Sequence, residues 1–397
     1  MTDLTRLRTV RAADVYKSGR RAAAMTKSID GTLEFRYLPE YLTASERPIA
    51  TTLPLTDEPI RTFGGSLPAY FAGLLPEGHR LSVLRRAVKT GLDDELTLLL
   101  AVGTDAPGDV QVIPRGEPLV EVPALVSGES PADLDFTDLV EKVDPHALPG
   151  VQQKASTSMI STPLAAGFGR FVLKLSQDGF PHLVENEALH LEAARLLKVP
   201  VAAGQLITDR AGTSGLLVRR FDRVERGGEW TRLAFEDATQ VMGIPPAGKY
   251  TVDAIEAVRA LAAVAHAPRV AVRNLYLQFL FAWLTGNGDL HAKNLGVLEA
   301  PDNRWAIAPI YDIPGTLIYD DDSMALPIGG RTRKLKARDW IGFGAEIGLP
   351  DRGAASARAV ALRAAAAVDY GRLPFTGSPV RRVERELGFR RSELQRL

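Results

Sequence analysis

Apolar residues recur at every third or fourth position between Val272 and Leu284. This spacing places them on one face of a helix, because an α-helix turns once every 3.6 residues. The helix should end at Thr-Gly-Asn-Gly, residues 285–288, since glycine and asparagine favour the left-handed conformation that closes a helix. The pattern predicts a helix with a buried face that ends in a polar loop.

Shorter patterns predict a mixture of strands and helices in the rest of the chain. In the first 120 residues we expect strands at 33–38 and 110–113 and helices at 67–75 and 81–88. Between residues 150 and 225 we expect a helix at 184–197 and strands at 171–175, 202–207 and 216–219. Further helices are expected at 354–368 and 381–397. The segments 295–298 and 305–310 flank a turn sequence and predict a hairpin.

Residues 115–135 are rich in proline, glycine, serine and acidic residues, a composition that connects domains more often than it packs within one. We therefore expect a domain boundary there, and a second one where strand patterns give way to helical ones. The predicted parts are an N-terminal α/β subdomain at 1–125, a sheet-containing part at 126–235 and a mainly helical lobe at 236–397. The predicted fold class is α+β.

The composition narrows the class of protein. The 397 residues include 48 Lys plus Arg and 48 Asp plus Glu, so no net charge draws the whole chain to nucleic acid or to a membrane surface. Cysteine is absent, which excludes disulfides, thiolate metal sites and cysteine nucleophiles and fits a reducing compartment. No segment resembles a signal peptide or a membrane span, so we expect a cytoplasmic protein without a membrane partner.

Side chains suited to phosphoryl transfer follow the predicted helix stop. Four residues separate Asp289 from Asn294, the spacing that protein kinases use for a catalytic base and a magnesium ligand. Because the strands of the next hairpin run antiparallel, Asp312 at its exit should return beside Asn294. Asn294 and Asp312 offer the hard oxygen ligands that Mg²⁺ prefers.

A lysine on the strand at 171–175 can reach nucleotide phosphates. Alternation along this strand places Lys174 and Val172 on the same face. Three glutamates of the following helix are candidate partners for Lys174, and we favour Glu187 over Glu185 and Glu192. The sequence PGVQQK at 149–154 precedes the strand, where a phosphate-covering loop would lie, although it is neither a G-x-G-x-x-G loop nor a Walker loop.

Several ordered segments together resemble the HipA family of bacterial toxin–antitoxin kinases. They are LPEYL and LPL near 38–55, GLLPEG at 73–78, PGVQQK at 149–154, FVLKL at 171–175, VENE at 184–187, RRFDR at 219–223, EDATQ at 236–240, GDLHAKN at 288–294, YDI at 311–313 and LPIGGR at 326–331. The resemblance runs through most of the chain. It implies a two-lobed fold distantly like that of eukaryotic protein kinases, with an extra N-terminal subdomain and a helical C-terminal lobe.

The resemblance also implies roles for individual residues, with ATP and Mg²⁺ as cofactors. Asp289 would be the catalytic base, Asn294 and Asp312 would bind magnesium, and Lys174 would touch the phosphates. The phosphate loop would comprise Pro149, Gly150, Val151, Gln152, Gln153 and Lys154. The adenine hinge would comprise Arg219, Arg220 and Phe221, acting through backbone groups. The remaining nucleotide contacts implied by the GDLHAKN and YDI segments are His291, Lys293 and Tyr311.

The family resemblance further implies partners. Family members are serine/threonine kinases that phosphorylate translation proteins, notably aminoacyl-tRNA synthetases. They are commonly held by a small helix-turn-helix antitoxin bound to operator DNA, so we expect DNA contact only jointly with the antitoxin. This sequence departs from the family at Ala147, where self-phosphorylating members carry serine, and at Gln153, where glutamate is commoner. Ser156, Thr157 and Ser158 are possible substitutes for the missing serine.

Plainer interpretations stand beside these roles. Asp289 and Asn294 are also typical of an Asx turn after a helix. Asp312 could be an ordinary acidic residue at the end of a strand, and Lys174 could be a solvated lysine on an edge strand. His291 could brace its loop instead of contacting phosphate, and Arg220 with Asp222 could form a structural salt bridge. Two basic clusters are either solvated faces or DNA contacts: Arg331, Arg333, Lys334, Lys336 and Arg338, and Arg381, Arg382, Arg385, Arg390 and Arg391.

Two other functions also remain open. The sequence Gly-Asp-Leu-His-x-x-Asn resembles the catalytic loop of aminoglycoside and choline kinases, so a small-molecule phosphotransferase is an alternative. A catalytically inactive kinase-fold scaffold that binds a DNA-binding partner is the other. The long N-terminal unit and the PGVQQK loop argue against the first, and the complete set of catalytic residues argues against the second.

Overall fold

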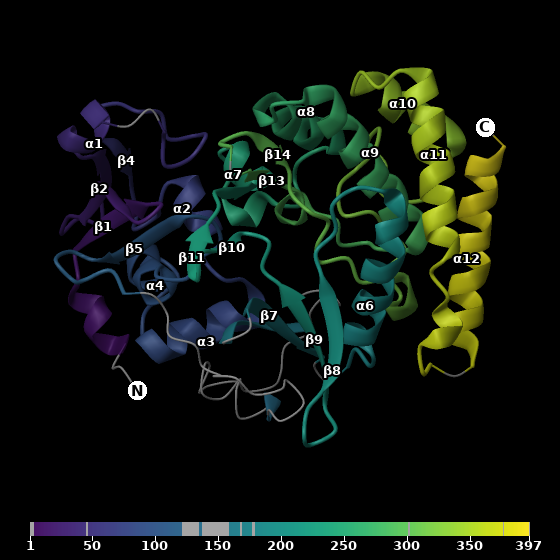
Figure 1. Ribbon diagram of the computed structural model, residues 1–397, viewed down its shortest axis with the longest axis horizontal. Coiled ribbons are helices and arrows are strands. Elements are labelled where there is room, and N and C mark those ends of the chain that lie inside the picture. The colour runs from purple at the N-terminus through teal and green to yellow at the C-terminus, as the bar shows by residue number, and fades with distance from the viewer. Residues whose placement is uncertain are drawn as a thin grey trace.

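The structure is a computed structural model that describes residues 4–44, 47–120, 135–136, 159–166, 169–176, 179–300, 302–375 and 377–396. The predicted phosphate loop at 149–154, Ala147, the candidate phosphosites at 156–158 and most of the predicted linker lie outside these residues. Figure 1 shows a sheet-containing N-terminal subdomain on one side of the molecule and a helical lobe on the other, with a second sheet between them.

The N-terminal subdomain is built on a five-stranded antiparallel sheet in the order β4-β3-β2-β1-β5. Its strands are β1 (Ala12–Lys17), β2 (Arg20–Lys27), β3 (Leu33–Tyr37), β4 (Ile60–Thr62) and β5 (Val110–Pro114), and its helices are α1 (Pro39–Ala44), α2 (Ala69–Gly73), α3 (Gly78–Val88) and α4 (Glu95–Val102). The elements predicted at 33–38, 67–75, 81–88 and 110–113 are confirmed as β3, α2, α3 and β5.

The hairpin formed by β1 and β2 was not predicted. Its strands are rich in alanine, which has little preference for strands. The connecting residues Ser18 and Gly19 both have positive φ, at 47° and 76°. Two consecutive positive φ values are the signature of a tight hairpin turn whose twist matches that of the strands, so the Ser-Gly pair was the local signal for this hairpin.

A second sheet has the antiparallel order β6-β7-β9-β8. Its strands are β6 (Met159–Ala166), β7 (Gly169–Ser176), β8 (Gly204–Thr208) and β9 (Ser214–Arg219), and helix α6 (Leu183–Ala194) packs against it (Figure 1). A short 3₁₀ turn at Arg195–Leu197 extends α6. The strands predicted at 171–175, 202–207 and 216–219 and the helix predicted at 184–197 are confirmed.

The helical lobe contains α7 (Ala238–Val241), α8 (Ala254–Val264), α9 (Pro268–Thr285), α10 (Ala337–Glu346), α11 (Asp351–Ala366) and α12 (Ser378–Gln395). A small sheet of β12 (Phe235–Asp237), β13 (Gly296–Glu299) and β14 (Trp305–Ile307) joins it, and β10 (Arg223–Arg226) and β11 (Glu229–Arg232) form a separate hairpin. The predicted hairpin is confirmed, because Val297 pairs with Ile307 in antiparallel register. In Figure 1, α11 and α12 lie side by side on the edge farthest from the N-terminal subdomain.

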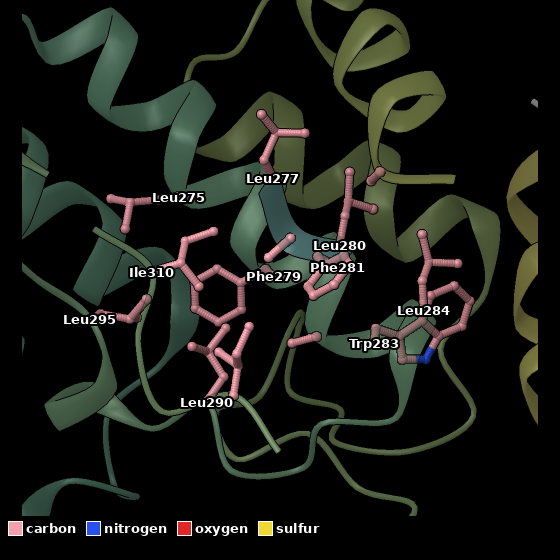
Figure 2. Close-up of a cluster of buried hydrophobic side chains, with 14 of the residues drawn as sticks. Leu275, Leu277, Phe279, Leu280, Phe281, Trp283, Leu284, Leu290, Leu295 and Ile310 are labelled. Carbon is pink, nitrogen blue, oxygen red and sulfur yellow. The ribbon is translucent and has the colours of Figure 1, made fainter. Parts of the chain in front are cut away.

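Helix α9 is buried on every side from Leu275 to Thr285, whereas its sequence predicted a single buried face. Helices α8, α11 and α12 and strand β14 surround it. Figure 2 shows Phe279 of α9 among Leu290, Leu295 and Ile310, which come from the loop and hairpin after the helix. A helix that is apolar all round forms the centre of a large core, so the loop that follows α9 starts from the centre of the core of this lobe.

Gly286 ends α9 in the left-handed conformation, with φ of 74°. Its carbonyl accepts hydrogen bonds from the amides of Thr316 and Leu317, at 2.8 and 2.9 Å. A Cβ atom at Gly286 would lie 2.7 Å from the Cβ of Leu317. The predicted helix stop is confirmed. The two hydrogen bonds connect the start of the polar loop to the segment that follows Asp312.

We expect Gly286→Ala to lower the free energy of unfolding by about 1–2 kcal/mol, because a side chain in the left-handed conformation is strained. Urea unfolding measures this change. Gly342→Ala in α10 is a matched control, because φ of Gly342 is not positive and a Cβ there meets no atom within 4 Å. The control should raise stability slightly; equal effects at both glycines would contradict the strain argument.

Among the residues that the structure describes, the buried side chains form two large cores and one small one. One large core belongs to the N-terminal subdomain, and the other runs from the second sheet through the helical lobe. The small cluster lies around Phe136 and the second sheet. The boundaries at 125/126 and 235/236 stay predictions. Within the described part of the chain, no helix has both the length and the apolarity that a membrane crossing requires.

Part of the C-terminal basic cluster is structural. The Arg390 guanidinium is buried and donates to the carbonyls of Trp283 and Asp322, both at 2.9 Å. Arg391 donates to the carbonyl of Ala365. These two arginines hold α12 against its neighbours, while Arg381 and Arg385 are exposed.

Candidate active site

A cavity of about 420 Å³ lies where the N-terminal subdomain, the second sheet and the helical lobe meet. This volume falls within the range of small-molecule sites. Ten of the residues predicted for the site line it: Lys174, Arg219, Arg220, Phe221, Asp289, His291, Lys293, Asn294, Tyr311 and Asp312. The other six, Pro149, Gly150, Val151, Gln152, Gln153 and Lys154, lie outside the described residues.

The loop after α9 is held by its own side chains. The Asn287 side-chain oxygen accepts the Asp289 amide at 2.8 Å, and the Asn294 side-chain amide donates to the Asp289 carbonyl at 2.9 Å. Asn287 therefore forms the Asx turn. The Asp289 carboxylate faces the cavity, where its Oδ1 accepts the Tyr250 hydroxyl at 2.9 Å.

Tyr250 was not predicted, because it lies in a short loop before α8 with no pattern of its own. Burial and the charge of Asp289 raise its pKa. Tyr250 therefore stays protonated at neutral pH and donates to Asp289. This hydrogen bond fixes one oxygen of Asp289.

Lys174 lies between two carboxylates. Its Nζ is 2.8 Å from both oxygens of Glu187 and 2.7 Å from Asp312 Oδ1. The Lys174 side chain is 9% exposed, so the solvated-lysine interpretation is wrong, and Glu187 is confirmed as the glutamate that pairs with it. Burial alone would lower the pKa of Lys174, but Asp312 and Glu187 raise it overall. For Asp312 burial would raise the pKa, and Lys174 reverses the shift.

Helix α6 and the hairpin place Asp312 in this position. The Asn186 side chain makes two hydrogen bonds to the backbone of Gly315, at 2.8 and 2.9 Å. The next residue of α6, Glu187, binds Lys174, which in turn binds Asp312. Helix α6 therefore holds the segment from Asp312 to Gly315 at both ends. The Tyr311 hydroxyl donates to the Lys293 carbonyl at 2.6 Å, which joins the loop to the hairpin exit. Asp312 has φ of 54°, an uncommon value for a residue other than glycine.

The cavity offers oxygen donors to a divalent cation. The Asn294 side-chain nitrogen is engaged by Asp289, which leaves its oxygen as the available donor, and Asp312 uses only Oδ1 for Lys174. An amide and a carboxylate fit Mg²⁺, which usually takes one or two protein ligands and completes its shell with water and phosphate. The described residues contain no group of three or more His, Cys, Asp or Glu arranged around one metal position.

His291 packs on the Tyr250 ring, with ring centroids 5.1 Å apart, and its Nε2 is 3.7 Å from Asp289 Oδ2. Burial, reinforced by the charge of Lys249, lowers the pKa of His291 to about 4. The ring is therefore neutral at pH 7. It can brace the loop or donate one hydrogen bond, but it offers no positive charge to a phosphate.

This histidine makes stability depend on pH. In the unfolded chain His291 binds a proton below its ordinary value of 6.5, but in the folded chain only below about 4. Stability should therefore fall by about 3 kcal/mol as pH falls from 6.5 to 4. The free energy of unfolding of His291→Asn should fall less over this pH range. Part of the fall should remain, because burial lowers the pKa of His190 as well. Identical pH profiles for variant and wild type would contradict the shift.

The predicted hinge is a short strand end beside an aromatic wall. The amides of Arg219 and Arg220 donate to the carbonyls of Ala203 and Arg170, at 2.8 and 2.9 Å, so these two amides belong to the protein's own backbone network. The ring centroid of Phe221 lies 5.5 Å from those of both Phe235 and Tyr311. The three rings form an apolar side of the cavity.

The Arg220 side chain belongs to a buried ion-pair network, as the structural alternative proposed. It contacts Asp222 at 2.9 Å and Asp105 at 2.8 Å, and Arg223 contacts the same two aspartates at 2.7 and 3.1 Å. Burial would raise the pKa of Asp222, but the two arginines lower it far below its usual range. Because Asp105 belongs to the N-terminal subdomain, the network joins that subdomain to the hinge. The backbone amide of Arg220 is also engaged, so only its carbonyl stays a candidate for nucleotide contact.

The loop at 73–78 of the N-terminal subdomain reaches the cavity, which the sequence did not predict. The Gly73 carbonyl accepts Lys293 Nζ at 2.7 Å, and Glu77 accepts Lys249 Nζ at 2.6 Å. Lys293 also lies 3.3 Å from Asp237. Loops that meet only in the folded protein leave no local pattern, although the GLLPEG segment was among the family landmarks.

Comparisons with known proteins agree with this arrangement. The HipA N-terminal domain family matches residues 13–113, and the HipA-like C-terminal domain family matches residues 146–368. Y4mE of Sinorhizobium fredii, which bears a provisional kinase designation, is 29% identical over 86% of this chain and 87% of its own. The serine/threonine-protein kinase toxin HipA of Shewanella oneidensis is 25% identical over 76% of each chain.

Among solved structures, the HipA of Shewanella oneidensis in complex with HipB and operator DNA matches with a TM-score of 0.76. The match covers 97% of both chains at 21% identity. It confirms the predicted α+β, two-lobed, protein-kinase-like fold of the HipA type. Since the C-terminal family match alone spans more than half of the 397 residues, the chain belongs to the HipA family.

Proposed function

We propose that this protein is an ATP- and Mg²⁺-dependent serine/threonine protein kinase that acts as the toxin of a toxin–antitoxin pair. The observation that carries the proposal is the meeting of Asp289, Asn294, Asp312 and Lys174 in one cavity, although 138 residues of sequence separate Lys174 from Asp312. Protein kinases need a base, magnesium ligands and a cation on the phosphates. The named kinases among the relatives support the same reaction class.

Each side chain has a role in the proposed reaction. The proton of the acceptor hydroxyl passes to the Asp289 carboxylate, whose Oδ1 accepts a hydrogen bond from the Tyr250 hydroxyl. Asn294 and Asp312 would hold Mg²⁺, which when bound would supply positive charge to offset the negative charge of the phosphates. Lys174 would turn from Asp312 toward the phosphates while Glu187 keeps it in place. Phe221, Phe235 and Tyr311 would line the adenine side.

The proposed partners follow from the relatives. HipA of Shewanella oneidensis is named as a toxin and is found with HipB and operator DNA. By analogy, this protein would pair with a small helix-turn-helix antitoxin and would reach operator DNA jointly with it. Its substrate would be a translation protein such as an aminoacyl-tRNA synthetase, and its compartment the cytoplasm.

Labelling with γ-phosphate-labelled ATP tests the proposal against its two alternatives. The purified protein would be incubated with Mg²⁺ and a bacterial extract, and in parallel with aminoglycosides or choline. We expect label on serine or threonine of one or a few proteins, its loss when EDTA removes Mg²⁺, and no label on the small molecules. Transfer to a small molecule alone would support the small-molecule phosphotransferase, and nucleotide binding without any transfer would support the inactive scaffold.

A further inference from the structure

A third lysine, Lys249, lines the described cavity wall from outside every predicted motif. Lys249 lies between a 3₁₀ turn (Pro246–Gly248) and α8, and it is only 9% exposed. Its carbonyl accepts the Ala292 amide at 3.1 Å, which fixes its backbone against the loop that carries Asp289. Its ammonium nitrogen lies 5.2 Å from the centre of the Tyr250 ring, and Tyr250 in turn holds Asp289. Lys249 is therefore a buried cation separated from Asp289 by one aromatic ring.

The other two lysines of the described cavity wall are more heavily engaged. Lys174 lies between Glu187 and Asp312, and Lys293 is bound to Gly73 and Asp237. The Lys249 ammonium forms an ion pair with Glu77 of the N-terminal subdomain, at 2.6 Å, and the Glu77 side chain is 32% exposed. An ammonium group has three hydrogens to donate, so an incoming phosphate oxygen can share Lys249 with Glu77 or take it over.

We propose that Lys249 contacts the phosphoryl group that is transferred, and that Glu77 of the N-terminal subdomain competes for this lysine when no nucleotide is bound. The inference rests on the proposed kinase function. In the reaction, a bond forms between the acceptor oxygen and the γ-phosphorus, and the bond to the oxygen that bridges to the β-phosphorus breaks. The acceptor proton goes to Asp289, ADP leaves, and Lys249 keeps its proton throughout. Its charge stabilises the equatorial oxygens of the group in transfer, where negative charge is spread.

The exchange gives the N-terminal subdomain a direct effect on the reaction. Glu77 lies on the loop that also binds Lys293 through Gly73, so movement of this loop changes which partner Lys249 has. A γ-phosphate that takes Lys249 from Glu77 loosens the contact between the subdomain and the segment of Lys249, whose backbone carbonyl is bound to the loop of Asp289. Nucleotide binding and the position of the N-terminal subdomain are therefore coupled through one ion pair.

Binding of ADP and of a non-hydrolysable ATP analogue, both with Mg²⁺, tests this inference by calorimetry on the full-length protein. The readout is the affinity for the analogue divided by the affinity for ADP, because only the analogue carries a γ-phosphate. Lys249→Met should weaken analogue binding by about 10- to 100-fold, the usual worth of a hydrogen bond to a charged group, and ADP binding by much less. Lys249→Arg should restore part of the loss. Glu77→Gln should shift the ratio in the opposite direction, by roughly two- to five-fold, because the competing carboxylate is gone.

Lys27→Met is the matched control. Lys27 forms an ion pair of similar length, 2.7 Å, with Asp94 in the same subdomain but outside the cavity wall, so its loss should leave the ratio unchanged. An unchanged ratio in Lys249→Met would overturn the phosphoryl contact. If the ratio of analogue affinity to ADP affinity in Glu77→Gln is equal to or below the wild-type ratio, Glu77 does not compete for Lys249. The Glu77–Lys249 pair would then be a structural link only. Failure of the wild-type protein to bind either nucleotide would instead refute the kinase proposal itself.

Discussion

Replacing Asp289 by asparagine should lower the rate of phosphoryl transfer by about 10²–10⁴, the usual contribution of a general base. The amide can still accept the hydrogen bond from Tyr250, but it cannot take the proton of the acceptor. The free energy of unfolding should stay the same or rise, because an amide is less costly to bury than a carboxylate. Initial rates of substrate labelling and urea unfolding measure the two quantities.

Asp302→Asn is a suitable control for this variant. Asp302 is an exposed turn residue paired with Arg304 and lies outside the described wall of the cavity. Its variant should keep the wild-type rate. Unchanged labelling by Asp289→Asn would remove Asp289 from the proposed role, whereas a loss of both activity and folding would show only that the loop had collapsed.

Lys174→Met should reduce both stability and activity. The substitution leaves Glu187, which is fully buried, without its cation, and breaking a buried pair in this way costs about 3–5 kcal/mol. The rate should also fall, by about 10²–10³, as when a single charged or hydrogen-bonding group is removed from a preorganised site. Chemical unfolding and labelling rates measure the two effects.

The double variant Lys174→Met/Glu187→Met separates the two roles. Replacing both partners of a buried pair by apolar side chains is often nearly neutral, so most of the stability should return. The activity should stay low, because the cation that contacts the phosphates is still missing. Recovery of the rate together with stability would mean that Lys174 serves the fold alone.

The sequence predicted those parts of the fold that repeat a local pattern. Helix α9, its stop at Gly286 and the hairpin after Asn294 were predictable because each has a periodicity or a turn sequence of its own. The β1–β2 hairpin was missed because its alanine-rich strands lack such a pattern. The burial of α9 on all sides depends on neighbours that are distant in sequence.

The residues of the candidate site also divide into those that the sequence predicted and those that it did not. Asp289, Asn294 and Asp312 could be placed together, since one loop and one hairpin link them, and Glu187 could be chosen because it shares a helix face with Val184. Glu77 and the adjacent residues Lys249 and Tyr250 could not, because they lie on two other loops whose positions beside Asp289 are set by packing. For the Arg220 side chain, the salt bridge to Asp222 could be proposed from the sequence, but the second partner, Asp105, could not, because it lies in the N-terminal subdomain.

A crystal structure with Mg²⁺ and a non-hydrolysable ATP analogue tests the central claim most directly. The account predicts the triphosphate in the cavity, the metal bound by the Asn294 side-chain oxygen and the Asp312 carboxylate, and the γ-phosphate facing Asp289. A nucleotide bound elsewhere, or a metal that contacts neither Asn294 nor Asp312, would contradict it.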